Sequence, residues 1–230
     1  VRNSELITYM KQLSIIVPYR NRASHLATFI PHMRARMKDC EIIVVEQADQ
    51  KPFNRAKLLN VGFLQSKADY FAFHDVDMLP VKADYSFPVN PTHIATKCSQ
   101  FRYKMPFAEY FGGVTLFNRE DFIACNGYSN NFWSWGAEDN EMYDNVLRCG
   151  LKIDRRDCTF QSLHHQLADR SCYEHNRELW MKGRGIEDGL SHCSYNVINR
   201  VEEKGFIRLI VDLTQFSIFY TLPTPPRKHG

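Results

Sequence analysis

Three apolar runs separated by two helical patterns fill the first half of the chain and constrain its fold more than any other feature. Residues 14–17, 41–45 and 70–73 have the length and the β-branched or aromatic content of buried strands. Between them, residues 23–37 and 56–64 repeat apolar side chains at the spacing of one helical face. The order strand, helix, strand, helix, strand predicts an α/β fold, a mainly parallel central sheet with helices on both faces.

The bulk composition narrows the possible classes of protein. A chain of 230 residues fits one domain with a substantial core, and no run approaches the roughly 18 apolar residues of a membrane span. The formal charge is only +3, and Lys and Arg are scattered along the sequence. A nucleic-acid-binding surface is therefore not expected.

The stretch HDVDMLP places Asp75 and Asp77 directly after the third apolar run. In open α/β sheets ligands bind outside the carboxyl ends of the strands, where residues 18–22 also leave the first run. In an extended segment the two carboxylates would point the same way and suit a divalent cation. Taken alone, such a pair is more often part of an ordinary turn.

Several long motifs in a fixed order carry a family resemblance. They are SIIVPYRNR from residue 14, FNRAKLLNVGF from residue 53, HDVDMLP, YFGGV from residue 110 and FWSWGAEDNE from residue 132. The chain resembles the β-1,4-galactosyltransferase family from about residue 14 to 197, most closely its xylosylprotein branch. The resemblance implies one GT-A glycosyltransferase domain over residues 1–230. Its nucleotide-binding half would span about 13–80, its acceptor-binding and catalytic half about 81–200, and its C-terminal strands about 205–222.

The resemblance further implies a metal-dependent transfer of galactose, with inversion, from UDP-galactose to an acceptor sugar hydroxyl in β-1,4 linkage. The expected cofactor is Mn²⁺, held by Asp77 and one downstream histidine. His165 is favoured over His164 by its distance from the DGL motif at residue 188, and Ser162 would be a poor ligand. Since neighbouring side chains in a strand face opposite ways, only one of the two histidines is expected to bind the metal.

Donor-binding residues follow from the same motifs. Arg55 would open a helix near Asn54, where backbone N–H groups add to its charge in an anion site. Phe53 would lie beside uracil, and Tyr110 would favour galactose over N-acetylgalactosamine. Without the resemblance, Phe53 is interpreted as a core residue, and Arg20 and Arg22 as part of a solvated loop. The full expected set is Pro18, Tyr19, Arg20, Arg22, Phe53, Arg55, Asp75, Val76, Tyr110, Gly113 and Trp135.

The expected catalytic residues are Asp139, as the base, and Glu138. Both precede an amphipathic helical pattern that ends near Gly150, and the helix dipole is expected to keep Asp139 ionised. Trp135 and Gly136 match a mobile loop of the family, and residues 169–188 match its long closing loop. The expected acceptor-binding set is Tyr110, Gly136, Ala137 and Asn140, the last replacing the aspartate usual in relatives.

Two other functions stay open from the sequence. The same fold could use a UDP-N-acetylhexosamine donor, against which Tyr110 speaks, or the chain could be a catalytically weak sugar-binding module of a larger glycan polymerase. The expected partners are UDP-galactose and a saccharide or glycoconjugate acceptor, with the oligomeric state open. Seven cysteines without a CxxC pair, and no N-glycosylation sequon, favour a cytoplasmic bacterial or viral setting. A Golgi lumen is the alternative if an anchor has been removed.

Overall fold

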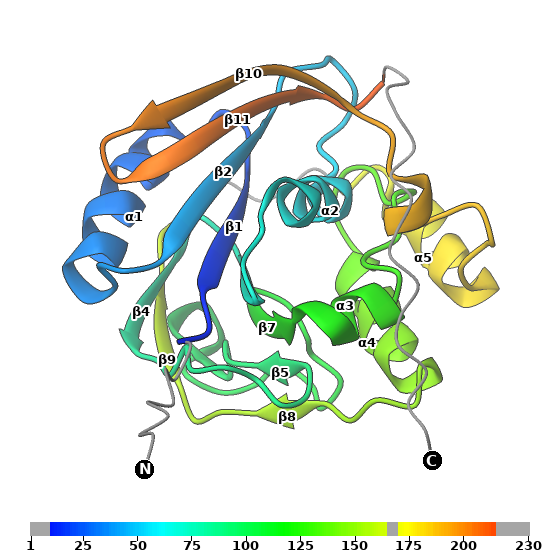
Figure 1. Cartoon of the computed structure of the whole chain (residues 1–230). Helices are drawn as coiled ribbons and strands as arrows, with labels where there is room; N and C mark the ends of the chain where they lie inside the picture. Colours follow the sequence, from blue (N-terminus) through cyan, green and yellow to red (C-terminus); the bar gives the residue numbers. More distant parts are fainter. Residues whose placement is uncertain (1–9, 165–169, 215–230) are drawn as a thin grey trace, which may run out of the picture.

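The computed structural model describes residues 10–164 and 170–214 and contains one large and one small sheet (Figure 1). The large sheet has eight strands in the order β10-β11-β2-β1-β3-β7-β5-β8, and the small one has three in the order β4-β9-β6. The strands of the large sheet are β1 Leu13–Tyr19, β2 Glu41–Gln47, β3 Tyr70–His74, β5 Thr92–His93, β7 Val114–Asn118, β8 Asp154–Arg155, β10 Asn196–Glu203 and β11 Phe206–Asp212. Those of the small sheet are β4 Met78–Lys82, β6 Lys97–Cys98 and β9 Thr159–Ser162.

The centre of the large sheet is parallel, as the sequence predicts, and antiparallel pairs lie on both sides of it, while the edge pair β5 and β8 is again parallel. Strands β11, β2, β1 and β3 run parallel to one another, whereas β10 pairs antiparallel with β11 and β7 with β3. All three predicted strands and both predicted helices are present. The helices are α1 Ala23–Arg36, α2 Arg55–Gln65, α3 Arg119–Ala124, α4 Glu138–Arg148 and α5 Tyr173–Lys182, with short 3-10 turns at Ser99–Phe101 and Leu190–His192.

Alternating strand residues build a separate core on each face of the sheet. Ile15 and Val17 pack with the apolar side of α1, while Ile16 packs with the buried side of α2. In Figure 1, α1 covers one face of the sheet, and α2, α3 and α4 lie on the other. Gly62 lets α2 approach closely, because a Cβ there would lie 2.2 Å from Cγ2 of Ile16. The expectation of helices on both faces is therefore confirmed.

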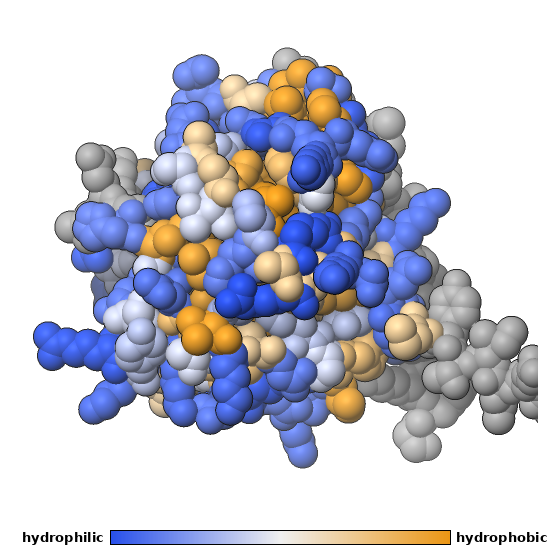
Figure 2. All heavy atoms as spheres, turned by 90° about the vertical axis from the view of Figure 1, so that its left-hand side faces the viewer, coloured by the Kyte–Doolittle hydropathy of each residue, from blue (hydrophilic) through white to orange (hydrophobic). Residues whose placement is uncertain are grey.

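The outer surface on the α1 side is mainly hydrophilic, with small apolar patches between charged side chains (Figure 2). The helix buries one stripe, formed by Leu26, Phe29, Ile30 and Met33, and most of its other residues are exposed or only partly buried. Among the described residues, no helix is long and apolar enough to cross a membrane.

The chain turns sharply where it leaves β3. The amide of Met78 donates to the carbonyl of Asp75 at 3.2 Å, and Val76 and Asp77 form the turn between β3 and β4. The prediction that residues 75–77 are extended is therefore wrong, and the two carboxylates do not alternate as in a strand. The physical reason is that the chain passes here from the large sheet into the small one.

Two later segments differ from their expected form. The stretch 169–188, expected to be the long closing loop, contains the helix α5. This helix packs beside α4, with a 2.7 Å hydrogen bond from Trp180 Nε1 to Asp144. Its one fully buried side chain is Asn176, so it shows no apolar periodicity. The C-terminal hairpin begins with β10 at Asn196, before the expected start near 205, and residues beyond 214 lie outside the described part.

Candidate active site

Two carboxylates from distant parts of the chain share one arginine at the carboxyl edge of the parallel strands. Arg55 Nε donates to Asp75 Oδ1 at 2.6 Å, and Arg55 Nη1 donates to Asp139 Oδ1 at 2.9 Å. Glu138 Oε1 lies 3.9 Å from the same Nη1. The Arg55 side chain is 12% exposed, so these charge-assisted bonds are largely shielded from water. The structure thus unites residues expected to bind the donor with the expected base.

Local structure explains why these three side chains converge. Asp75 follows β3, while Arg55 is the first residue of α2, whose N-cap Asn54 accepts a 2.8 Å hydrogen bond from the Lys57 amide. Asp139 lies in the first turn of α4. Since α2 and α4 both begin at this edge, their first turns present one cation and two acids to Asp75, the residue that follows β3.

The protonation of Asp139 differs from the sequence expectation. Burial raises the pKa of Asp139 to about 8, opposed by the Arg55 charge and aided by the nearby Glu138 and Asp75. Burial also raises the pKa of Glu138. The prediction that Asp139 stays ionised is therefore not supported near neutral pH, because burial, the largest cause, raises its pKa. A carboxylate with a pKa near the working pH suits general base catalysis.

Tyr110 and the Gly112-Gly113 pair form a wall against Asp139. A Cβ on Gly112 would lie 2.4 Å from Asp139 Oδ2 and 2.9 Å from Cε2 of Tyr110, so only glycine fits without displacing the carboxylate. Gly113 has a φ of +77°, and its carbonyl accepts the Asp75 amide at 3.0 Å. Burial raises the pKa of Tyr110 well above its usual value, so its phenol remains neutral.

The buried His93, which the sequence reasoning missed, forms a hydrogen bond with the backbone of Gly112 in this wall. Its Nε2 is 2.9 Å from the Gly112 carbonyl, and its Nδ1 is 2.7 Å from Nη1 of Arg155. A carbonyl only accepts and a guanidinium only donates, so the proton lies on Nε2. Arg155 also donates to the Tyr110 carbonyl at 2.8 Å. No spacing in the sequence relates His93 or Arg155 to the YFGGV motif.

The other expected donor-binding residues lie along the same edge. The Arg20 guanidinium is 5.4 Å from the ring centroid of Phe53 and donates to the Lys51 carbonyl at 2.6 Å. The phenyl ring is partly buried against the core. Arg22 Nη1 is 3.4 Å from His25 Nδ1. Of the remaining expected residues, Pro18, Tyr19 and Val76 are buried.

The candidate metal ligands lie where β9 ends beside the turn after β3. The Leu163 amide donates to the Asp77 carbonyl at 2.7 Å, which places Asp77 next to Ser162 and His164 in the backbone. His165 lies outside the described residues. Among residues 10–164 and 170–214 no three His, Cys, Asp or Glu side chains form a metal cluster. Asp77 and one histidine would give the mixed oxygen and nitrogen donors that fit Mn²⁺ with open positions.

Ser162 is already engaged, as its poor suitability as a ligand suggests. Its hydroxyl is 2.7 Å from Sγ of Cys98 and 3.7 Å from Sδ of Met78. His164 is exposed and lies two residues beyond the end of β9, and its carbonyl is 3.1 Å from Nε2 of His25. These contacts join the start of α1 to the end of β9 beside the candidate metal site.

The expected acceptor-binding residues lie in a strained loop that leads into α4. Trp135 is 42% exposed, with the Tyr173 ring centroid at 5.6 Å and the Arg170 guanidinium at 4.5 Å. Gly136 has a φ of +109° and Ala137 a φ of +71°. Tyr173 begins the stretch 173–180, which by its position in the expected closing loop could shape the acceptor site, whereas Arg170 has no role predicted from the sequence.

The part of that loop before Trp135 is tied to both sides of the site. The amide of Ser134 donates to the Phe53 carbonyl at 2.7 Å. From α5, Asn176 Nδ2 donates to the Trp133 carbonyl at 2.9 Å. Asn140, half-buried in the first turn of α4, follows Asp139 directly. The loop therefore connects the expected uracil side of the site with α5.

Comparison with known proteins agrees with this geometry. One matching family model is described as the N-terminal region of glycosyl transferase group 7 and covers residues 6–88. Another is described as the N-terminal domain of galactosyltransferase and covers residues 92–167. Mouse β-1,4-galactosyltransferase 1 is 37% identical over 218 residues, 88% of this chain and 55% of that protein. Human β-1,4-galactosyltransferase 7 is 36% identical over 208 residues, 82% of this chain and 62% of that protein. The chain thus spans about half the length of the first and somewhat more of the second.

Solved structures show the same similarity. The catalytic domain of Drosophila β-1,4-galactosyltransferase 7 in complex with xylobiose is 31% identical, with a TM-score of 0.81, over 90% of this chain and 95% of that one. A mutant of the Drosophila enzyme, in complex with manganese, UDP-Gal and xylobiose, gives a TM-score of 0.77 at 29% identity, with the same two coverages. At 15% identity, a mannosyltransferase from Pyrobaculum calidifontis shares only the fold, with a TM-score of 0.54 over 74% of this chain and 61% of that one. The curated relatives named here come from animals and give no support to a bacterial or viral cytoplasmic setting.

Proposed function

Because the chain belongs to the β-1,4-galactosyltransferase family and has the GT-A fold, we propose that it transfers galactose from UDP-galactose to an acceptor sugar hydroxyl. The transfer is metal-dependent, inverts the anomeric centre and makes a β-1,4 linkage. The observation that carries the proposal is the centre in which Arg55 holds Asp75 at 2.6 Å and Asp139 at 2.9 Å. It joins donor-binding groups to a base at one edge of the sheet.

Asp139 is the base of the proposed reaction. It takes the proton from the acceptor hydroxyl as that oxygen attacks the anomeric carbon on the face opposite UDP. The Arg55 bond orients its carboxylate, and the contact with Gly112 restricts where that carboxylate can lie. General base catalysis of this kind contributes typically about 10²–10⁴-fold in rate. Glu138, 3.9 Å from Arg55, adds to the negative potential at the site.

The donor is held along the edge formed by Arg20, Phe53 and Asp75. The Phe53 ring gives uracil an apolar surface, and Arg20, now over that ring, supplies a cation beside it. Asp77 and one of His164 and His165 would hold Mn²⁺, which would supply positive charge to offset the negative charge that develops on UDP. A Drosophila relative crystallised with manganese and UDP-Gal supports the choice of metal and donor.

The acceptor we favour is a β-xyloside. This choice is supported by the Drosophila relatives crystallised with xylobiose, the more similar of which matches this chain with a TM-score of 0.81. Trp135 and Tyr173 offer exposed aromatic surface for a sugar ring beside Asp139. Asn140 would donate a hydrogen bond where relatives usually only accept one, so the acceptor contacts differ in detail. The animal relatives also favour the Golgi lumen as the compartment.

The product of the reaction tests this proposal. The protein is incubated with UDP-galactose or UDP-N-acetylgalactosamine, Mn²⁺ or EDTA, and β-xylosides, glucosides or N-acetylglucosaminides, and products are analysed by NMR. We expect a β-1,4-galactosylated product that requires Mn²⁺ and is lost in Asp77→Asn. The matched control Asp157→Asn, at a side chain that is 69% exposed, should retain activity.

Each other outcome points to one of the alternatives. Preferred transfer of N-acetylgalactosamine would replace the galactose donor by the N-acetylhexosamine donor. Binding of UDP without transfer to any acceptor would leave a sugar-binding module. An α-linked product would refute the inverting geometry in which Asp139 acts opposite UDP.

A further inference from the structure

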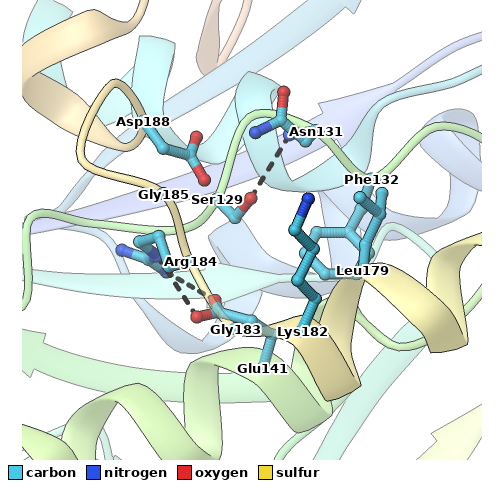
Figure 3. Close-up of a pocket in the computed structure, with 10 residues that line it drawn as sticks. All are labelled: Ser129, Asn131, Phe132, Glu141, Leu179, Lys182, Gly183, Arg184, Gly185 and Asp188. Atoms are coloured by element: carbon cyan, nitrogen blue, oxygen red, sulfur yellow. Dashed lines mark hydrogen bonds and ion pairs between the residues drawn. The ribbon is translucent and has the colours of Figure 1, made fainter.

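A second pocket lies between α4, the C-terminal end of α5 and the loops at residues 129–132 and 183–188 (Figure 3). Its volume is about 310 Å³, at the lower end of the roughly 300–1,000 Å³ of small-molecule sites. None of its lining residues belongs to the Asp75, Arg55 and Asp139 centre or to the expected donor, metal and acceptor sets. The proposed transferase reaction therefore gives this pocket no role.

Asp188 brings a buried carboxylate with one unpaired oxygen to this pocket. The residue is 2% exposed, and its Oδ1 accepts the amides of Asn130 and Gly189, each at 2.7 Å. Its Oδ2 receives no hydrogen bond from the described part of the chain. In Figure 3 this carboxylate points from the 183–188 segment towards the middle of the pocket. A buried acceptor left unpaired costs about 1–3 kcal/mol, so a bound donor there would be favoured.

The arginine beside Asp188 is committed elsewhere. Arg184 pairs with the buried Glu141 through Nη2 at 2.5 Å and donates from Nη1 to the carbonyls of Cys125 and Gly127, at 3.1 and 2.8 Å. Glu141 is further neutralised by Arg148 at 2.8 Å. The pocket consequently presents Asp188 as its unpaired acceptor, and Lys182 lines it as a potential donor.

The rest of the lining combines an apolar wall with small polar groups. Phe132 and Leu179 supply the apolar surface. The Ser129 hydroxyl accepts the Asn131 amide at 3.3 Å, and a hydroxyl also donates. An apolar wall facing a few placed polar groups is the usual composition of a small-molecule site.

We propose that this pocket binds one monosaccharide unit, at a site separate from the catalytic centre. Sugar hydroxyls donate to Asp188 Oδ2 and accept from Lys182, and the C–H face of the ring packs on Phe132. A simple anion fits poorly because the Asp188 carboxylate would repel it. A metal ion fits poorly because Asp188 offers one unpaired oxygen and Lys182 adds positive charge.

Binding rather than turnover tests this site, so the result does not depend on the transferase activity. Saturation-transfer NMR and calorimetry are run on the full chain with methyl β-galactoside and N-acetylglucosamine, leaving out the β-xyloside that Trp135 is proposed to contact. The variants are Asp188→Asn, which keeps Oδ1 and replaces the unpaired acceptor by a donor, and Lys182→Met at an exposed position. Trp135→Ala is the matched variant in the catalytic region.

We expect at least one of these saccharides to bind the wild type and Trp135→Ala equally. Its affinity should fall at least tenfold in both Asp188→Asn and Lys182→Met, with unchanged thermal unfolding in the lysine variant. Absence of binding at millimolar sugar would overturn the proposal, as would binding unaffected by both pocket variants or lost in Trp135→Ala. A crystal soaked with the sugar that showed only water beside Asp188 would also overturn it.

Discussion

Replacing Gly112 by alanine should damage activity far more than stability. The new Cβ would lie 2.4 Å from Asp139 Oδ2, whereas ordinary contacts begin at about 3.4 Å, so the carboxylate must move by about 1 Å. The backbone itself can accept alanine, since Gly112 is not among the residues with positive φ. The main atom that yields is the tip of the Asp139 side chain, which costs little folding energy, and the edge of the Tyr110 ring, at 2.9 Å, must yield by a few tenths of an ångström. A misplacement of about 1 Å at a reacting group can reduce the rate about 10²-fold.

The assay is kcat/KM for galactose transfer, measured together with thermal unfolding. We expect Gly112→Ala to lose about 10²-fold in kcat/KM, with a loss of unfolding free energy of about 1 kcal/mol or less. Gly185→Ala is the matched control, since a Cβ there meets no atom within 4 Å and its φ is not positive. Full activity in Gly112→Ala would refute the placement of Asp139 at the reacting centre. A loss of activity explained by unfolding would refute the argument that the side chain yields.

Three further predictions concern stability. Ala137 has a φ of +71°, a backbone conformation that is strained for alanine but not for glycine. Ala137→Gly should therefore raise the free energy of unfolding by about 0.5–1 kcal/mol in urea titrations. A decrease would contradict the strain at Ala137. Burial lowers the pKa of His93 to about 3, from about 6.5 when unfolded, so its contribution is complete above about pH 6.5 and is lost towards pH 3. From pH 7 to 4.5 this loss is about 2.5 kcal/mol of unfolding free energy. The unfolding free energy of His93→Gln should therefore fall by about 2.5 kcal/mol less than that of the wild type over this range. An equal fall in both proteins would exclude His93 as the source. Arg184→Met should lower the free energy of unfolding by about 3–5 kcal/mol, because it leaves Glu141 buried without its main partner. Adding Glu141→Gln should recover part of this loss. Strictly additive losses in calorimetry would argue against an interaction between Arg184 and Glu141.

The sequence was informative where side-chain periodicity or long motifs exist. The parallel strands and helices α1 and α2 follow from apolar spacing, and the start of α2 follows from Asn54 as its N-cap. The place of Asp75 follows from the rule that ligands bind at the carboxyl ends of parallel strands. The meeting of Arg55 with both Asp75 and Asp139 did not follow, because no local pattern encodes contacts between the starts of two distant helices.

Other features escaped prediction for physical reasons that can be named. The α5 helix buries Asn176 in place of an apolar stripe, so periodicity could not find it. The turn at Val76 and Asp77 depends on a second sheet that receives the chain, and the short strands of that sheet carry little pattern of their own. The raised pKa of Asp139 is set by burial in the assembled site, whereas the sequence shows only its position near a helix start.

Acceptor-dependent release of UDP from UDP-galactose, compared between the wild type and Asp139→Asn, tests the central claim most directly. The isosteric variant keeps the Oδ1 that accepts from Arg55 and removes the group that takes the proton. The account predicts Mn²⁺-dependent release with a β-xyloside in the wild type and a loss of at least 10²-fold in Asp139→Asn, with UDP binding retained. Equal release by the two proteins would contradict Asp139 as the base, and no release by either would contradict the transferase itself.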